Sequence, residues 1–113
     1  MSYSSKVSTT VAPEVLTAIA RMAVLNVPGV IRLAEVPGGV NRVFRRGAED
    51  GVQIRVEDQQ VEVNLYLILD GNVNLREVSR NVQQQVARAI HEMVGMEVLA
   101  VHVHIENVEY PSE

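Results

Sequence analysis

The sequence predicts an α+β domain, a two-layer α/β sandwich with elements in the order β-α-β-β-α-β. Two segments carry apolar residues at helical spacing, and two others alternate strictly between apolar and polar residues. Both helical segments are apolar on one side and the longer strands are half polar. We therefore expect both helices on one face of a mixed sheet of three or four strands. At 113 residues, 47% of them apolar, the chain is predicted to form a single domain over residues 1–113.

The first third of the chain predicts a helix over residues 12–26 between two short strands. The strands are expected at residues 6–10, "KVSTT", where the first strand would be frayed, and at 29–34, "GVIRLA". Apolar residues between them recur at i, i+3, i+4 and i+7, which is typical of a helix with one buried face. These residues are Leu16, Ile19, Ala20, Ala23, Val24 and Val27.

The second half predicts a β-hairpin, a long helix and a last strand. Alternation at residues 52–57 and 61–69 gives the two hairpin strands. Asn74 can cap a helix over residues 75–94, and Gly95 can end it. The buried stripe of this helix is expected to be Leu75, Val78, Val82, Val86, Ala89, Ile90 and Met93. In the last strand, Leu99, Val101, Val103 and Ile105 are expected to face the core.

A mobile loop is predicted at about residues 35–50, and short flexible termini at both ends. The loop segment is rich in glycine, proline and charge and shows no sustained period. It contains Arg42, Arg45 and Arg46, and guanidinium groups can hold phosphates or an acidic protein surface. These three arginines are candidate anion-binding residues. A solvated loop without a ligand is the simpler interpretation of the same residues.

Two histidines stand two residues apart in "VHVHI" at 101–105, so strand geometry places His102 and His104 on one face. The pair could reach one ion, yet a structural zinc site needs four ligands and a catalytic site usually needs three. We therefore interpret the histidines as solvent-facing strand residues, with a surface pH response as an alternative, and expect no metal site.

Strand alternation also predicts which residues lie on the outer face of the sheet. If Leu65, Leu67 and Leu69 face the helices, Tyr66 and Ile68 face away, together with Val98, Ala100 and the two histidines. The uncovered face is then mixed apolar and polar. Such a surface suits self-association or partner docking, although scattered apolar residues are also ordinary on protein surfaces. The candidate partner-binding residues are Tyr66, Ile68, His102 and His104.

No motif in the sequence supports catalysis, so we expect no enzyme, no catalytic residue and no cofactor. The chain lacks cysteine, which excludes a disulfide framework and a cysteine nucleophile. A net charge of -4 argues against charge-driven binding of nucleic acid. No apolar run approaches the roughly 18 residues of a membrane span, and the first residues do not read as a secretory leader. We expect a cytoplasmic protein.

Three stretches carry a family resemblance: residues 11–30, the hairpin at 51–69, and residues 73–108, which begin "VNLREV" and end "VHVHIENV". In these stretches the chain resembles the alkaline shock protein family, also described as envelope stress response proteins. The resemblance implies a non-enzymatic cytoplasmic protein linked to cell-envelope homeostasis. It also implies self-association and, as in some members, a place near the membrane through a separate anchor protein.

The sequence therefore leads to two hypotheses from different classes. The first is a structural or scaffolding protein of the cell-envelope stress response that acts through protein–protein contacts. It would form a homo-oligomer and reach the membrane only through an anchoring partner. The alternative is a small binding module for an anionic ligand or nucleic acid, which would use the three loop arginines.

Overall fold

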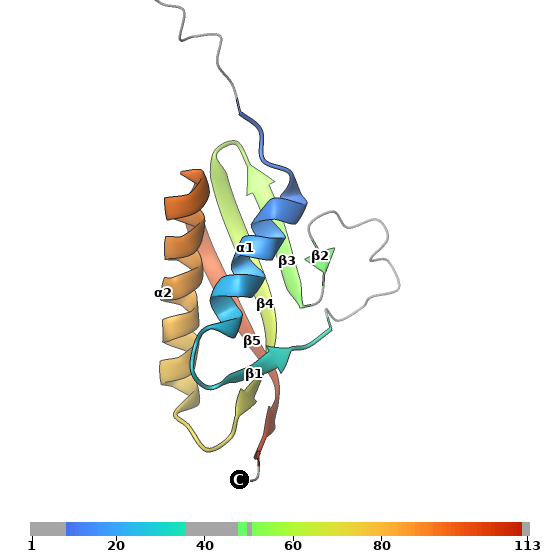
Figure 1. Ribbon diagram of the computed structural model, residues 1–113, viewed down its shortest axis with the longest axis vertical. Coiled ribbons are helices and arrows are strands. Elements are labelled where there is room, and N and C mark those ends of the chain that lie inside the picture. Colours follow the sequence, from blue (N-terminus) through green and yellow to red (C-terminus); the bar gives the residue numbers. More distant parts are fainter. Residues whose placement is uncertain (1–8, 36–47, 50, 112–113) are drawn as a thin grey trace, which may run out of the picture.

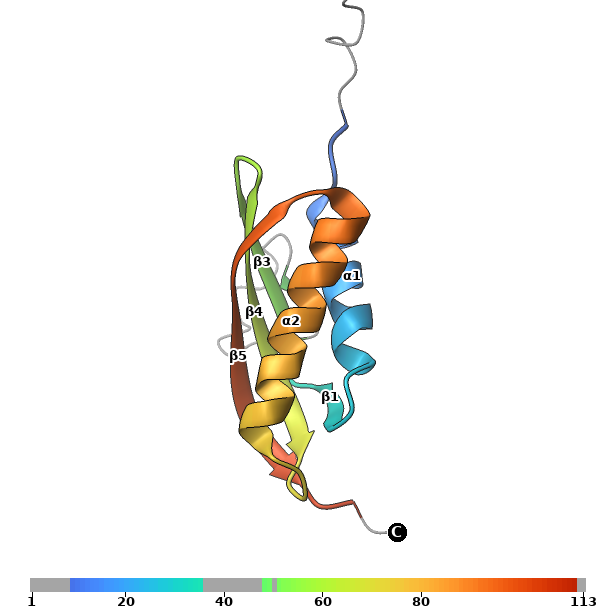
Figure 2. The same ribbon diagram turned by 90° about the vertical axis from the view of Figure 1, so that its left-hand side faces the viewer.

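Two helices lie side by side over one face of a sheet, and no element of the described residues covers the other face (Figures 1 and 2). The computed structural model describes residues 9–35, 48–49 and 51–111. Within these ranges the order of elements is α1 (Pro13–Leu25), β1 (Val30–Leu33), β2 (Ala48–Glu49), β3 (Val52–Glu57), β4 (Gln60–Asp70), α2 (Leu75–Val94) and β5 (Glu97–Glu109). The predicted α+β class and the placement of both helices on one side are confirmed.

Strand β4 is the centre of the sheet and has a neighbour along each edge. On one edge, β3 pairs antiparallel with residues 60–65 of β4, and β1 pairs antiparallel with residues 67–69. On the other edge, β5 runs parallel to β4 over its whole length. The short β2 pairs with β3 and lies outermost on that side. The sheet is therefore mixed, as predicted, but it has five strands among the described residues instead of the predicted three or four, because β2 was not expected.

Tyr66 occupies the point where β1 gives way to β3 along the edge of β4. Its backbone N–H donates to the carbonyl of Gly51 at 2.9 Å, and its carbonyl accepts from the N–H of Ala34 at 2.7 Å. Gly51 adopts a φ of +83°, in the left-handed region that favours glycine. The gap between two end-to-end strands is thus closed by backbone hydrogen bonds at one residue, and this fixes Tyr66 in the sheet.

Both helices begin and end close to the predicted residues. In α1, Pro13 stands in the first turn, where its missing N–H costs no hydrogen bond. In α2, the side chain of Asn74 accepts from the N–H of Glu77 at 3.0 Å, and Gly95 ends the helix with a φ of +75°. The predicted stripe of α2 needs one correction. Met93 is 60% exposed, because it lies in the last turn at the rim of the groove between the two helices.

Strand β5 contains an irregularity that changes which residues face the helices. Val98 pairs with Val61 and Ala100 pairs with Glu62, so Leu99 is one residue too many for the ladder. The prediction for this end of the strand is therefore wrong. Val98 packs against the core, whereas Leu99 is 57% exposed. Alternation resumes after the bulge, and the prediction that Val101 and Val103 face the core is confirmed. The same prediction is wrong for Ile105, which is 39% exposed.

The core is a single layer of aliphatic side chains between the helices and the sheet. The odd-numbered residues of β4 from Val61 to Leu69 are fully buried, as are Val82, Val86 and Ile90 of α2. The expected strand at residues 6–10 has no counterpart at Thr9 and Thr10, and residues 6–8 lie outside the described residues. The predicted loop at 35–50 also lies largely outside them, apart from Glu35 and the two residues of β2.

Candidate interaction face of the sheet

The open sheet face, on the side away from the helices, carries most of the polar side chains of β3, β4 and β5. On β4 it is formed by the even-numbered residues, because the odd-numbered ones are buried under the helices. His102 pairs with Asn64 and His104 pairs with Tyr66, so both histidines project on this side, as the sequence predicted. The residues of this face used below are Arg55, Glu62, Asn64, Tyr66, Ile68, His102 and His104.

Glu62 joins the three strands of the face through its two carboxylate oxygens. Arg55 of β3 binds Oε1 at 2.7 Å, and Nε2 of His102 lies 2.9 Å from Oε2. A carboxylate oxygen can only accept, so Nε2 carries the hydrogen of this contact. The hydrogen bond from His102, followed by the positive charge of Arg55, holds the pKa of Glu62 below its usual value. Glu62 thus remains a carboxylate that orders one side chain on each neighbouring strand.

His104 makes a second set of contacts one row along the strands. Its Nε2 donates to Oδ1 of Asn64 at 2.9 Å, and its ring stacks on Tyr66 with centroids 4.6 Å apart and an angle of 12° between the planes. Stacked rings bury apolar area and restrict each other's rotation. Tyr66 and His104 are both half-buried, so their stacked rings form a small aromatic patch on the open face.

The two histidines therefore bond to different β4 residues instead of converging on one point. Both Nε2 atoms are already engaged, one by Glu62 and one by Asn64. Across the described residues, no group of three or more histidine, cysteine, aspartate or glutamate side chains is arranged to hold a metal ion. The chemistry that this arrangement supports is recognition through hydrogen bonds and aromatic contact.

An ion pair closes the far end of the face. Arg32 of β1 binds Glu109 of β5 with two nitrogen–oxygen contacts of 2.9 and 2.5 Å, so the pair spans β4 from one edge to the other. The pair lowers the pKa of Glu109 and raises that of Arg32. Ile68 pairs with Arg32 and is only 9% exposed. It lies on the predicted face, but it offers little surface to a partner.

The structure brings together Tyr66, His102 and His104 among the predicted site residues and places Ile68 beneath the end of the face. Arg42, Arg45 and Arg46 lie outside the described residues. The sequence analysis did not include Arg55, Glu62 or Asn64 among the candidate partner-binding residues. Arg55 faces Glu62 across the predicted hairpin, but the β4–β5 register that brings the histidines to Glu62 and Asn64 is a long-range pairing with no local signal.

Comparisons with known proteins agree on a family and a fold. A model of the alkaline shock protein 23 family, described as having a cell envelope-related function, matches residues 2–110. Two similar proteins of Bacillus subtilis (strain 168) are uncharacterized. YloU is 26% identical over 99 residues, covering 84% of this chain and 82% of YloU. YqhY is 23% identical over 105 residues, covering 91% and 78%.

Solved structures of the MamM CTD share the fold. One superposes with a TM-score of 0.53 at 16% identity and covers 85% of this chain and 95% of the other. A zinc form superposes with the same score at 17% identity and covers 85% and 86%. Among the described residues, neither helix is long and apolar enough to cross a membrane.

Proposed function

Because the chain belongs to the alkaline shock protein 23 family, we propose that it is a non-enzymatic scaffolding protein of the bacterial cell-envelope stress response. It acts through protein–protein contacts, associates with itself, and binds an envelope-associated partner such as a membrane-anchoring protein. It works in the cytoplasm and meets the membrane only through that partner. The observation that carries the proposal is the open sheet face, whose side chains are held in place before any partner arrives.

Preorganisation is what makes this face suitable for docking. Ordering a flexible side chain at an interface costs roughly 0.5–1.5 kcal/mol, and side chains that are already fixed avoid most of that cost. Arg55, Glu62 and His102 hold one another, as do Asn64, His104 and Tyr66. Tyrosine and arginine are also enriched among the residues that dominate binding energy.

The same face argues against catalysis by its histidines. A histidine oriented by a carboxylate, as His102 is by Glu62, resembles the base of a nucleophilic triad. Such a base commonly activates a serine, threonine, cysteine or lysine side chain, and the sequences of β3, β4 and β5 contain none of these four residue types. The His102–Glu62 pair therefore lacks these nucleophiles on its own three strands, which favours a binding role.

Affinity capture from the native cell tests the proposal. The full chain carries a small tag and is compared with Tyr66→Glu and His104→Ala, each confirmed as folded by thermal melting. The matched control is Gln84→Glu, an exposed position on α2 in the other layer. Wild type and control should enrich an envelope-associated protein, and the two face variants should lose it. The proposal fails if no envelope-associated protein is enriched, or if the face variants recover it as well as the control does.

A further inference from the structure

Strand β5 forms an edge of the sheet over its whole length. One side of β5 pairs with β4, and no strand of the described residues pairs with its other side. In Figure 2, β5 runs along the margin of the sheet beside α2. The strand has 13 residues, well beyond the roughly 5–6 residues of an average strand. An edge strand presents a row of backbone N–H and C=O groups, which is a template for pairing with another chain.

The backbone groups that point outward from this edge belong to Val101, Val103 and Ile105. The backbone of Tyr66 bonds to the junction of β1 and β3, so the odd-numbered residues of β4 direct their groups the other way, toward β5. Their partners in the register are Val63 with Val101, Leu65 with Val103, and Leu67 with Ile105. In a parallel ladder only one residue of such a pair points its groups at the other strand. The groups of the three β5 residues therefore point away from β4.

A side chain of α2 already bonds to one of these outward groups. The side-chain amide of Gln83 donates to the carbonyl of Val101 at 3.0 Å, so this carbonyl accepts from outside the sheet, as the register requires. Within the part of the chain that the structure describes, the other outward groups of Val101, Val103 and Ile105 have no hydrogen-bond partner. The edge thus offers three donors and two acceptors to another backbone.

The side chains along this part of the edge do not protect it from pairing. Native proteins blunt an edge with lysine, proline, inward-pointing charges or bulges. The register of β5 is irregular beside Leu99 and again between Ile105 and Asn107. Between these irregularities stands "AVHVHI", residues 100–105, which contains no lysine, arginine, carboxylate or proline. The two irregularities limit the regular edge to residues 100–105 and leave it open between them.

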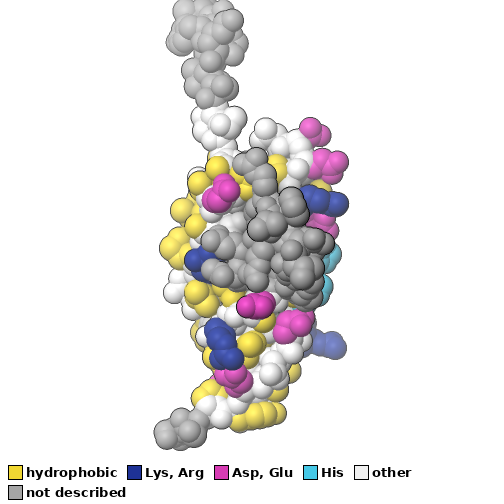
Figure 3. All heavy atoms as spheres, turned by 90° about the vertical axis from the view of Figure 1, so that its right-hand side faces the viewer, with side chains coloured by type: hydrophobic (Ala, Val, Ile, Leu, Met, Phe, Trp, Pro, Cys, Tyr) yellow, Lys and Arg dark blue, Asp and Glu magenta, His cyan; other side chains and the backbone are white. Residues whose placement is uncertain are grey.

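The end of the edge near the β3–β4 turn is acidic. Glu97 lies in register with Gln60, and Gln60 lies in register with Glu57, which Asp58 follows in the turn. Figure 3 shows acidic side chains gathered at this end of the molecule.

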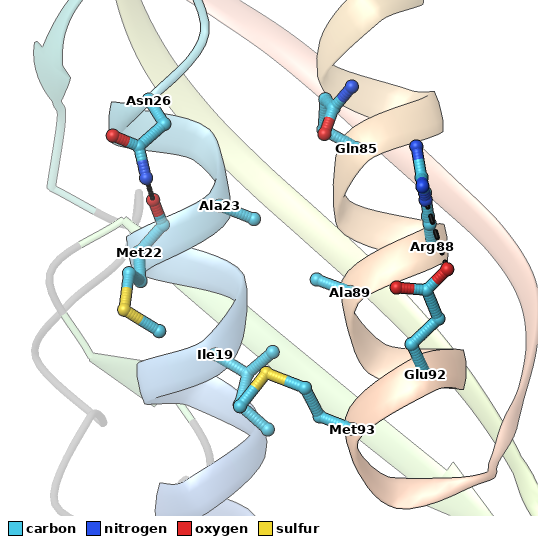
Figure 4. A pocket seen from close by; sticks show the side chains of 9 residues that line it. All are labelled: Ile19, Met22, Ala23, Asn26, Gln85, Arg88, Ala89, Glu92 and Met93. Carbon is cyan, nitrogen blue, oxygen red and sulfur yellow. Dashed lines mark hydrogen bonds and ion pairs between the residues drawn. The ribbon is translucent and has the colours of Figure 1, made fainter.

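The charges of α2 do not offset this acidic end. Arg88, in the second half of α2, binds Glu92 at 3.0 Å (Figure 4). At the other end of the edge, opposite charges balance. Arg76 lies seven residues before Gln83, about two helical turns, and so shares its side of α2. The first turns of α2 lie beside the end of β5, where Glu106 is exposed (Figure 2).

We propose that the edge at residues 100–105 binds an extended segment of a partner protein, which adds to the sheet as a further strand and carries lysine or arginine at the end that meets Glu97. The inference rests on the proposed function and deepens it, because it states how the envelope-associated partner is held. The added strand lies beside His102 and His104, so it continues the open sheet face. In such pairing, backbone hydrogen bonds supply affinity and side chains supply specificity.

A second copy of the chain fits this edge less well than a basic segment does. Strand β5 has glutamate at both ends and contains no lysine or arginine, so a copy of it cannot supply the basic end. Antiparallel pairing of two β5 strands about Val103 would also set Glu97 of each copy opposite Glu109 of the other. Like charges directly opposite each other across a ladder are destabilising. The occupant is therefore a different chain.

The first test follows amide hydrogen exchange in the full chain by NMR. In the chain alone, the N–H groups of Val101, Val103 and Ile105 should exchange quickly and those of His102 and His104 slowly, because only the latter two point into the sheet. The probe is a synthetic peptide of three valine–threonine repeats preceded by two lysines. At about 5 mM it should slow the three outward amides at least about threefold, as a millimolar dissociation constant requires.

Three results of this test would overturn the inference. The first is slow exchange of the outward amides in the chain alone, which would mean that the edge is not open. The second is a peptide that leaves their exchange unchanged. The third is protection that rises with protein concentration in the absence of peptide, which would assign the edge to a second copy.

The second test reverses charges. A peptide with two glutamates in place of the two lysines should bind the wild-type chain at least about threefold more weakly, because opposite charges across an interface favour the correct partner. Glu97→Lys should reverse this preference. Glu14→Lys, at an exposed position on α1, should keep it and is the matched control. An unchanged preference in Glu97→Lys would contradict the acidic end of the edge.

The third test separates the backbone of the edge from its side chains. Ile105→Pro and Ile105→Ala both remove a side chain that is 39% exposed, but only proline also removes the outward N–H. An edge strand tolerates proline where the N–H is not part of the ladder. Slow exchange at His102 and His104 checks that the strand of Ile105→Pro keeps its place. Ile105→Pro should bind the lysine peptide at least about fivefold more weakly than Ile105→Ala, and equal binding would overturn the inference.

The two proposals fail separately. The peptide tests use the purified chain, so capture without an envelope-associated protein would remove the proposed function while the exchange data still judge the edge. Where capture succeeds, Ile105→Pro should lose the captured protein and Ile105→Ala should retain it. Retention by both variants would keep the scaffold function and overturn the pairing of the partner with β5.

Discussion

Replacing Gly51 with alanine should destabilise the fold by more than its small size suggests. A Cβ on Gly51 would lie 2.3 Å from the carbonyl oxygen of Ala34 and 3.0 Å from that of Tyr66. These are backbone atoms of the junction where β1 gives way to β3, so they cannot move without loosening the hydrogen bond between Ala34 and Tyr66. The φ of +83° adds roughly 1–2 kcal/mol for an L-residue, and a weakened buried hydrogen bond adds about 1–3 kcal/mol.

Gly95→Ala supplies the matched control for this prediction. Gly95 has a φ of +75°, but a Cβ there would meet nothing within 4 Å. Its substitution should therefore cost only the backbone strain, roughly 1–2 kcal/mol. Urea unfolding followed by far-UV circular dichroism gives both free energies, and Gly51→Ala should lose at least about 1 kcal/mol more than Gly95→Ala. Equal losses would refute the steric account of the junction.

Three further outcomes follow from local contacts. Asn74→Ala should lower the free energy of unfolding, measured in urea, by about 1 kcal/mol, because the side chain that accepts from the N–H of Glu77 at the start of α2 is lost. Val98→Asp should lower the melting temperature far more than Leu99→Asp, since only Val98 packs on the core. The reverse order of the two melting temperatures would indicate a strand without the bulge. Glu62 and Glu109 have lowered pKa values, so their stabilisation is present above about pH 4.3 and is lost as pH falls through the folded pKa. Changing Glu62 and Glu109 to Gln should make the urea midpoint depend less on pH in the acid range. An unchanged dependence would contradict the role given to these two carboxylates.

Local signals in the sequence were enough to predict the helices and the two faces of β4. Asn74 and Gly95 mark the ends of α2 by side-chain and backbone chemistry that acts within four residues. The alternation of β4 places Tyr66 on the open face because strand geometry has a period of two. The positions of both histidines follow from the same rule, once the strand is recognised.

Features that depend on contacts between distant strands could not be predicted. The bulge at Leu99 belongs to the register between β5 and β4, in which Val98 pairs with Val61 and Ala100 pairs with Glu62, and a single sequence carries no mark of that register. The contact of Glu62 with His102 of β5 is hidden for the same reason, whereas Arg55 faces Glu62 across the local β3–β4 hairpin. Met93 fits the periodic stripe of α2, but it lies in the last turn of the helix, at the rim of the groove between the two helices, and is therefore exposed.

Crosslinking in the living cell from the open sheet face tests the central claim most directly. A photoreactive phenylalanine analogue at position 66 keeps an aromatic ring where Tyr66 stacks on His104, and the same analogue at Gln84 samples the exposed side of α2. The account predicts a crosslink from position 66 to an envelope-associated protein that position 84 does not give. Absence of that product from position 66, or the same products from both positions, would contradict it.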